Sequence, residues 1–146
     1  MKPKQEYNLQ SSTTRTSAGD VWLHAATGLI RYNLAEKKSY HYFSTRPDNA
    51  FGQAETIFSF HIDAGNIAWI GTANGLIRFD YKTGIAQTYD QIGNRKPGPI
   101  YSLAEDQQGR IWVGTQQQGI FYFDKRTRLF GTIESPSSSA QAINQY

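Results

Sequence analysis

Hydrophobic residues in this chain fall in short runs that alternate with turn residues. The clearest run, residues 67–72, is apolar at consecutive positions and is followed by the dipeptide Asn74-Gly75 and a second run at residues 76–80. Consecutive apolar positions predict a strand buried on both faces, and Asn-Gly is a strong signal for a tight hairpin. This segment therefore predicts two paired, buried strands.

Two further strands are predicted on either side of this hairpin. Residues 57–62 form an aromatic and β-branched run, which precedes the turn at residues 63–66. A turn at residues 82–84 leads into the last run, residues 85–89. Four antiparallel strands joined by tight turns make up one blade of a β-propeller.

The same pattern occurs three times. Trp22, Trp69 and Trp112 mark the copies and are 47 and 43 residues apart, a period typical of propeller blades. The third copy predicts strands at residues 100–105, 110–115, 120–123 and 128–133, and the first at residues 20–25, 29–33 and 39–43. The first copy should begin with an inner strand at residues 10–17, which we expect to be weak because residues 11–16 carry no apolar side chain.

The predicted fold class is therefore all-β, a partial propeller of about three blades, each a four-stranded antiparallel sheet. Ile57 and Ile100 open two inner strands 43 residues apart, and the same step leads to Ile143, where a fourth blade would begin. The expected segments are a tail (1–9), a degenerate first blade (10–43), a second blade (57–90), a third blade (100–134), and a tail or the start of a fourth blade (135–146).

The repeated motif resembles the two-component regulator propeller repeat. It contains Gly-x-Ile-Trp-Ile/Val-Gly-Thr, a second glycine, and a Phe-Asp pair, and it is nearly intact in the second and third copies. The first copy departs from it, since His24-Ala25 replaces Gly-Thr. The residues expected to form the repeat core are Trp22, Gly28, Tyr32, Trp69, Gly71, Gly75, Phe79, Trp112, Gly114, Gly119 and Phe123.

The resemblance implies a function in signal transduction. Such repeats form the periplasmic sensor half of bacterial membrane proteins whose output half is a histidine kinase or a diguanylate cyclase. In gut bacteria these sensors respond to breakdown products of polysaccharides. The resemblance thus implies a periplasmic or extracellular location, no cofactor, and no enzymatic activity in this segment. The sequence itself has no recognisable signal peptide and none of the output motifs.

The composition of the chain limits which kinds of fold and binding site it can have. The chain is 38% hydrophobic and 14% aromatic, which suits many short strands with large buried rings. It has no cysteine, a net charge of +3, and no apolar run long enough to span a membrane. Lys125, Arg126 and Arg128 form its densest basic group, which we interpret as a solvated hairpin turn and not as a nucleic-acid site.

Propeller geometry brings the interblade loops to the same face as the turns between the second and third strands. These loops are the longer and more polar ones, and long loops on a rigid scaffold often bind ligands. Amide and guanidinium groups suit the hydroxyl groups of sugars. The candidate ligand-binding residues are Arg46, Asn49, Asn74, Arg95, Gln116 and Gln117.

Several other residues that could suggest a binding site are expected to have structural roles instead. The three tryptophans recur inside a strand and are expected in the interblade core, not in a stacking platform. Asp63 and Asp106 occupy turns, and the glycine after each strand tryptophan is expected to let the next blade approach closely. His24, His41 and His61 lack the spacing of a metal site, so no metal is expected.

Three functions remain open. The first is a non-enzymatic sensing module of a two-component-type sensor that binds an extracellular or periplasmic ligand such as a carbohydrate. The second is a propeller enzyme of the carbohydrate-active or lyase type. The sequence argues against it, because no pair of carboxylates departs from the repeat pattern. The third is a three-blade structural unit that closes a ring as a homodimer. The expected partners are further blades of the same parent chain or a second copy, with no nucleic acid and no membrane contact.

Overall fold

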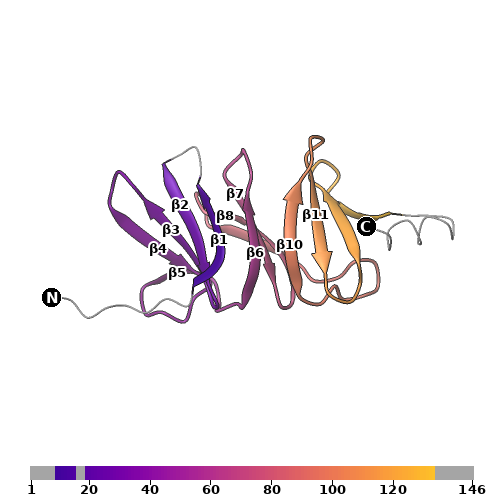
Figure 1. Cartoon of the computed structure of the whole chain (residues 1–146), viewed down its shortest axis with the longest axis horizontal. Coiled ribbons are helices and arrows are strands. Elements are labelled where there is room, and N and C mark those ends of the chain that lie inside the picture. Colours follow the sequence, from indigo (N-terminus) through magenta and orange to yellow (C-terminus); the bar gives the residue numbers. More distant parts are fainter. Residues whose placement is uncertain (1–8, 16–18, 134–146) are drawn as a thin grey trace.

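The computed structural model describes residues 9–15 and 19–133, and this part of the chain consists of strands and turns without a helix. Three sheets stand side by side in chain order (Figure 1), and within each sheet the strands follow one another as neighbours. The all-β fold of propeller blades is confirmed. The first sheet contains β1 (Leu9–Arg15), β2 (Asp20–Ala25), β3 (Leu29–Asn33), β4 (Lys38–Tyr42) and β5 (Asn49–Phe51). The second contains β6 (Ile57–Ile62), β7 (Ile67–Thr72), β8 (Gly75–Asp80) and β9 (Ile85–Tyr89), and the third contains β10 (Ile100–Glu105), β11 (Arg110–Thr115), β12 (Ile120–Asp124) and β13 (Leu129–Thr132).

The strand bounds differ little from those that the hydrophobic pattern predicts. The strands of the second sheet agree to within one residue, while β4 begins one residue early and β13 is shorter than residues 128–133. The inner strand expected to be weak is present as β1, which pairs antiparallel with β2 through the backbone. A backbone ladder needs no apolar side chain, and the pairing of this strand is irregular between Leu9 and Thr13. The fourth blade proposed to begin at Ile143 lies outside the described residues.

The segment between the first and second sheets differs from the expected loop. Residues 49–51 form β5, which pairs parallel with β4. Asn49 holds the segment in place, because its Oδ1 accepts the amide of Ser44 at 3.0 Å and its Nδ2 donates to the carbonyl of Gly52 at 2.8 Å. Phe51 then stacks on Phe79 of the second sheet, with ring centroids 5.0 Å apart. The first sheet therefore has a fifth strand that the repeat pattern does not predict.

The core lies between the sheets. The inner strand β6 packs beside β1 and β2, and β10 packs beside β6 and β7. Two apolar clusters result, one between the first and second sheets and one between the second and third. The first is formed by Trp22, Leu29, Tyr42, Phe43, Ile57, Phe60, Ala68, Ile70, Ile77 and Phe79, and the second by Trp69, Leu76, Ile100, Ile111, Val113 and Phe123.

Two of the three tryptophans are buried in these clusters, as predicted. Trp22 contacts Tyr81 in the β8–β9 turn at 5.1 Å between ring centroids, and Trp69 contacts Phe123 of the third sheet at 5.4 Å. Trp112 is only half-buried, and its ring lies 5.1 Å from that of Tyr122 in its own sheet. In the third sheet, the face that carries the tryptophan is therefore partly exposed, whereas the first two sheets bury it.

Gly71 explains how closely the sheets approach. A Cβ atom at this position would lie 2.7 Å from both Cγ2 and the carbonyl oxygen of Ile100 in the next sheet, and it would also clash with Oγ of Ser59. That hydroxyl donates to the carbonyl of Ile100 at 3.0 Å, which joins the two inner strands. The predicted role of this glycine, close approach of the next blade, is confirmed. At Gly114 the added Cβ would clash only with Oγ of Ser102 in its own sheet.

Candidate functional site

The inner strands carry a β-bulge at the same place in the second and third sheets. In β6 the pairing shifts between Ile57 and Ser59, and in β10 it shifts between Ile100 and Ser102. The extra residues are Phe58 and Tyr101. Bulges often redirect a side chain near a functional site, and here both redirected side chains are aromatic.

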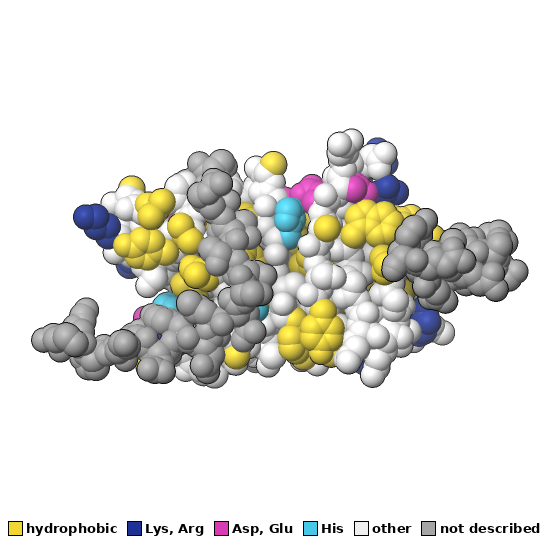
Figure 2. Space-filling model, viewed as in Figure 1, with side chains coloured by type: hydrophobic (Ala, Val, Ile, Leu, Met, Phe, Trp, Pro, Cys, Tyr) yellow, Lys and Arg dark blue, Asp and Glu magenta, His cyan; other side chains and the backbone are white. Residues whose placement is uncertain are grey.

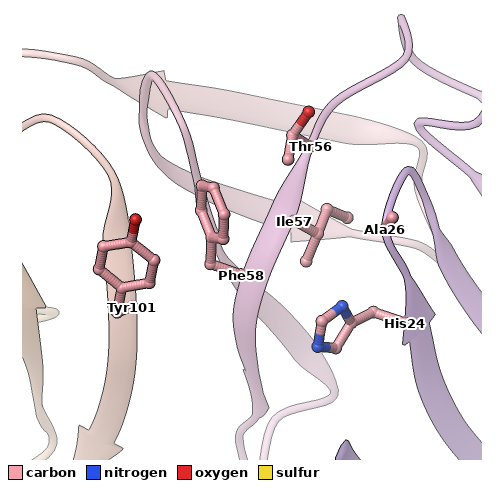
Figure 3. A pocket seen from close by; sticks show the side chains of 6 residues that line it. All are labelled: His24, Ala26, Thr56, Ile57, Phe58 and Tyr101. Atoms are coloured by element: carbon pink, nitrogen blue, oxygen red, sulfur yellow. The ribbon is translucent and has the colours of Figure 1, made fainter. Parts of the chain in front are cut away.

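The two rings form a pair across neighbouring sheets. Their centroids are 4.8 Å apart with an interplanar angle of 52°, and Tyr101 is 47% exposed. Figure 3 shows them side by side on adjacent inner strands, and Figure 2 shows apolar surface in the region of β6 and β10. An exposed aromatic pair on a rigid scaffold is a candidate contact surface for a ligand.

A pocket of about 280 Å³ adjoins this pair. It opens where the turn between β2 and β3 meets the start of β6, on the face to which the sequence assigns the ligand-binding loops. The side chains that line it come from all three sheets (Figure 3) and are His24, Ala26, Thr56, Ile57, Phe58 and Tyr101.

Backbone hydrogen bonds fix the wall of the pocket between the first two sheets. The amide of Gly28 donates to the carbonyl of Glu55 at 3.1 Å, and the amide of Ile57 donates to the carbonyl of Ala26 at 3.3 Å. The amide of Ala73 donates to the carbonyl of Thr56 at 3.2 Å. Because three turns are joined in this way, the pocket residues on them are held before any ligand binds.

His24 lies at the position that Gly71 and Gly114 occupy in the other repeats. Its ring is buried and packs edge-on against Phe60, with centroids 5.7 Å apart. Burial lowers the pKa of His24, so the imidazole is neutral at pH 7. Nδ1 lies 3.1 Å from the carbonyl oxygen of Ala25, which can only accept, so Nδ1 carries the proton and Nε2 is a hydrogen-bond acceptor.

On the opposite face, a turn aspartate holds each of the two later tryptophans. Asp63 accepts the indole N–H of Trp69 at 2.9 Å, and Asp106 accepts that of Trp112 at 2.7 Å. Both carboxylates also accept amides of their own turns, so their predicted turn role is correct but incomplete. Six residues before Trp22 the sequence has threonine, and the indole N–H of Trp22 has no partner among the described residues.

An ionic cluster joins the second and third sheets beside Asp63. Nζ of Lys125 lies 2.7 Å from Oε2 of Glu105 and 3.2 Å from Oδ2 of Asp63, and Nε2 of His61 lies 2.8 Å from Oε1 of Glu105. Acidic and histidine side chains are visible together at the upper edge of the molecule in Figure 2. Lys125, predicted to be a solvated turn residue, thus bridges two blades.

The cluster shifts the pKa values of its members. Burial alone would raise the pKa of both Asp63 and Glu105, but hydrogen bonds outweigh burial and both pKa values are lowered. Asp63 accepts hydrogen bonds from Trp69 and the Ile67 amide. Glu105 accepts them from Lys125 and His61. For Lys125, burial lowers the pKa, but Glu105 and Asp63 outweigh burial and raise it. The folded chain therefore favours the charged form of all three groups.

Lys125→Met is expected to lower Tm at pH 7 and to make Tm fall less steeply between pH 7 and pH 3. Carboxylates with lowered pKa values stabilise the fold above their unfolded pKa values near 4, and this contribution is lost as the pH falls through the folded values. Without the ammonium group, the folded pKa values move towards the unfolded ones. Thermal denaturation between pH 3 and pH 7 measures the slope, with Lys82→Met in an exposed turn as the control. Equal slopes in both variants would contradict the role of Lys125.

None of the six loop residues proposed from the sequence is among the described residues that line this pocket, although Asn74 directly follows Ala73, whose amide bonds to Thr56. Arg46 pairs with Asp48 at 2.9 Å, and Asn49 closes the loop around β5. The Arg95 guanidinium lies 5.9 Å from the ring centroid of Phe121. Asn74 occupies the β7–β8 turn, where its backbone amide donates to Oγ1 of Thr72 at 3.0 Å. Gln116 and Gln117 are exposed in the β11–β12 turn.

Sequence reasoning missed the pocket residues because it treated the inner strands as regular. Two signals pointed to them. Phe58 and Tyr101 are aromatic and are 43 residues apart, and His24 breaks the repeat at a glycine position.

Two further observations concern the described residues alone. In residues 9–15 and 19–133, no three His, Asp or Glu side chains are grouped closely enough to hold a metal ion. Nor does this part of the chain contain a helix with the length and apolar character needed to cross a membrane.

Comparison with known families identifies the repeat. The family described as the two-component regulator propeller matches residues 94–117, which include β10, β11, Tyr101 and Trp112. The chain carries a two-component regulator propeller repeat. The family match covers a single two-component regulator propeller repeat, whereas the motif in the sequence also extends to the earlier copies. None of the curated proteins matches the sequence.

Solved structures with the same arrangement of blades come from Bacteroides thetaiotaomicron. The extracellular domain of BT4673, described as a one-component system, is 24% identical with a TM-score of 0.69, covering 93% of this chain and 18% of that one. A second structure of BT4673, described as a hybrid two-component system, is 26% identical with a TM-score of 0.64, covering 83% of this chain and 16% of that one. The extracellular domain of the hybrid two-component system BT3049 is 18% identical with a TM-score of 0.67, covering 94% of this chain and 21% of that one. The chain thus covers about a fifth of the length of these domains.

Proposed function

We propose that this chain is part of the sensor propeller of a two-component-type regulator, and that it binds a ligand outside the cytoplasm without transforming it. The match of residues 94–117 to the two-component regulator propeller carries this proposal. The extracellular domains that share its blade arrangement support a periplasmic or extracellular location. Ligand binding would then change the activity of an output domain elsewhere in the parent protein, such as a histidine kinase or a diguanylate cyclase.

The pocket beside Phe58 supports binding without catalysis. Among the residues whose side chains the structure describes, those that line the pocket include no carboxylate, and the imidazole of His24 is buried and bonded to its own strand. Hydrolysis of a glycosidic bond commonly needs two carboxyl groups on opposite sides of the bond. The proposed ligand class is an oligosaccharide, recognised and released unchanged.

The test is to mix the chain with oligosaccharides released from polysaccharides and to follow both Tm and the number of reducing ends. We expect at least one mixture to raise Tm while the number of reducing ends stays constant, because a ligand that binds only the folded state stabilises it. An increase in reducing ends would support the carbohydrate-active enzyme instead. If no mixture changes Tm, the sensing proposal fails.

We further propose that another blade covers the open face of the third sheet, either from the same parent chain or from a second copy. Trp112 is half-buried there, and Leu129 and Ile133 are exposed. Stacked repeats bury such faces against their neighbours. Light scattering distinguishes the two sources: a stable dimer would support the self-assembling three-blade unit, and an aggregating monomer would support a longer parent propeller.

A further inference from the structure

We infer that the pocket at Phe58 and Tyr101 binds one uncharged sugar ring, with the exposed Tyr101 ring beneath the apolar face of the sugar and the tilted Phe58 ring beside it. This inference rests on the proposed sensing function and adds the place of binding and the charge of the ligand. It moves the site from the polar loops to the bulged inner strands.

The aromatic pair provides the apolar contact. Phe58 and Tyr101 belong to different sheets, and both are placed at the pocket by bulges at equivalent positions. A pyranose has a face of C–H groups that loses contact with water when it lies on an aromatic ring, and this burial favours binding. The exposed ring of Tyr101 has this surface available in the described chain.

The polar groups suit hydroxyls at the edge of such a ring. Thr56 and Tyr101 each carry a hydroxyl that can donate or accept, and Nε2 of His24 can accept. Few polar groups within a largely apolar pocket are typical of small-molecule sites, where they fix the orientation of the ligand. The volume of about 280 Å³ lies near the lower limit of ordinary ligand pockets and favours a single ring.

The same residues disfavour a charged ring. The six described side chains that line the pocket are uncharged, since the pKa of His24 is lowered by burial. A uronate carboxylate placed here would lose hydration without gaining a cation. Glu55, which directly precedes Thr56, is half-buried and would repel an acidic sugar when ionised.

The experiment uses the full chain with labelled phenylalanine and tyrosine rings, observed by NMR during titration. The probes are methyl glucoside, methyl galactoside and methyl mannoside, with methyl glucuronide as the charged counterpart. We expect at least one neutral glycoside to bind and to shift the Phe58 and Tyr101 ring signals, and glucuronide to bind at least tenfold more weakly. Tyr101→Ala and Tyr101→Leu are expected to weaken binding about tenfold, the loss of one stacking contact.

The control is Ile85→Ala, which removes an exposed apolar side chain from an outer strand and should leave binding unchanged. Tyr101→Leu keeps apolar bulk on the strand and therefore guards against loss of fold in the alanine variant. The inference is overturned if no neutral glycoside binds, if glucuronide binds equally well, or if both Tyr101 variants bind like the parent chain. In the last two cases a ligand still binds, so the sensing function would survive without this site.

Discussion

Gly71→Ala is expected to destabilise the chain by about 3 kcal/mol, at the upper end of the usual cost of overpacking. The added methyl group would lie 2.7 Å from the carbonyl oxygen of Ile100, which belongs to the backbone of the next inner strand and cannot rotate away. It would also displace the Ser59 hydroxyl that donates to that carbonyl. Denaturant unfolding followed by tryptophan fluorescence measures the change in the free energy of unfolding.

Gly114→Ala is the matched control, because it makes the same substitution at the equivalent position of the third sheet. There the added methyl group meets only the side chain of Ser102, which can adopt another rotamer. We expect a change within about 1 kcal/mol, as for substitutions away from tight packing. Equal losses in the two variants would show that the glycine is needed within a blade and not between blades.

Asp63→Ala is expected to cost about 3 kcal/mol, because it leaves several donors without an acceptor. The buried indole N–H of Trp69 loses its partner, as do the amides of Gly65 and Ile67, and Lys125 loses one of its two carboxylates. The substitution therefore weakens a turn, a core tryptophan and the contact between two sheets together. Thermal and denaturant unfolding should both report the loss.

Asp80→Ala provides the comparison for Asp63. Asp80 also caps a turn, accepting the amides of Lys82 and Thr83, but these donors are exposed and can bond to water instead. We expect its removal to cost about 1 kcal/mol or less. A similar cost for both aspartates would mean that the indole hydrogen bond adds little to the capping of a turn.

The strands could be predicted because the signals for each strand and turn lie in consecutive residues of each repeat. Runs of apolar residues, Asn-Gly and the turn aspartates place β6 to β9 almost to the residue. The burial of Trp22 and Trp69 and the close approach at Gly71 followed from repetition, since a feature kept at the blade period serves the contact between blades.

The pocket could not be predicted by the same means, because it depends on small departures from regular pairing. A bulge has no reliable sequence signature, and both the Phe58 and the Tyr101 rings depend on one. The contact between Lys125 and Asp63 joins residues that are 62 positions apart, and no local pattern reports it. The loop candidates Arg46 and Asn49 have the polarity expected of binding residues, but Arg46 pairs with Asp48 and Asn49 bonds to Ser44 and Gly52, all within the same loop.

The additional strand β5 has a consequence for how copies of this chain could associate. Outer strands β9 and β13 each end a sheet, and an outer edge offers unpaired backbone groups to any other strand it meets. In the first sheet the short strand β5 occupies that edge along β4, and Phe51 anchors it to the second sheet. Edge-to-edge pairing, the route by which β proteins form fibrils, is therefore hindered at the end of β4 that β5 covers, His41 and Tyr42, and charged substitutions meant to suppress it belong on β9 and β13.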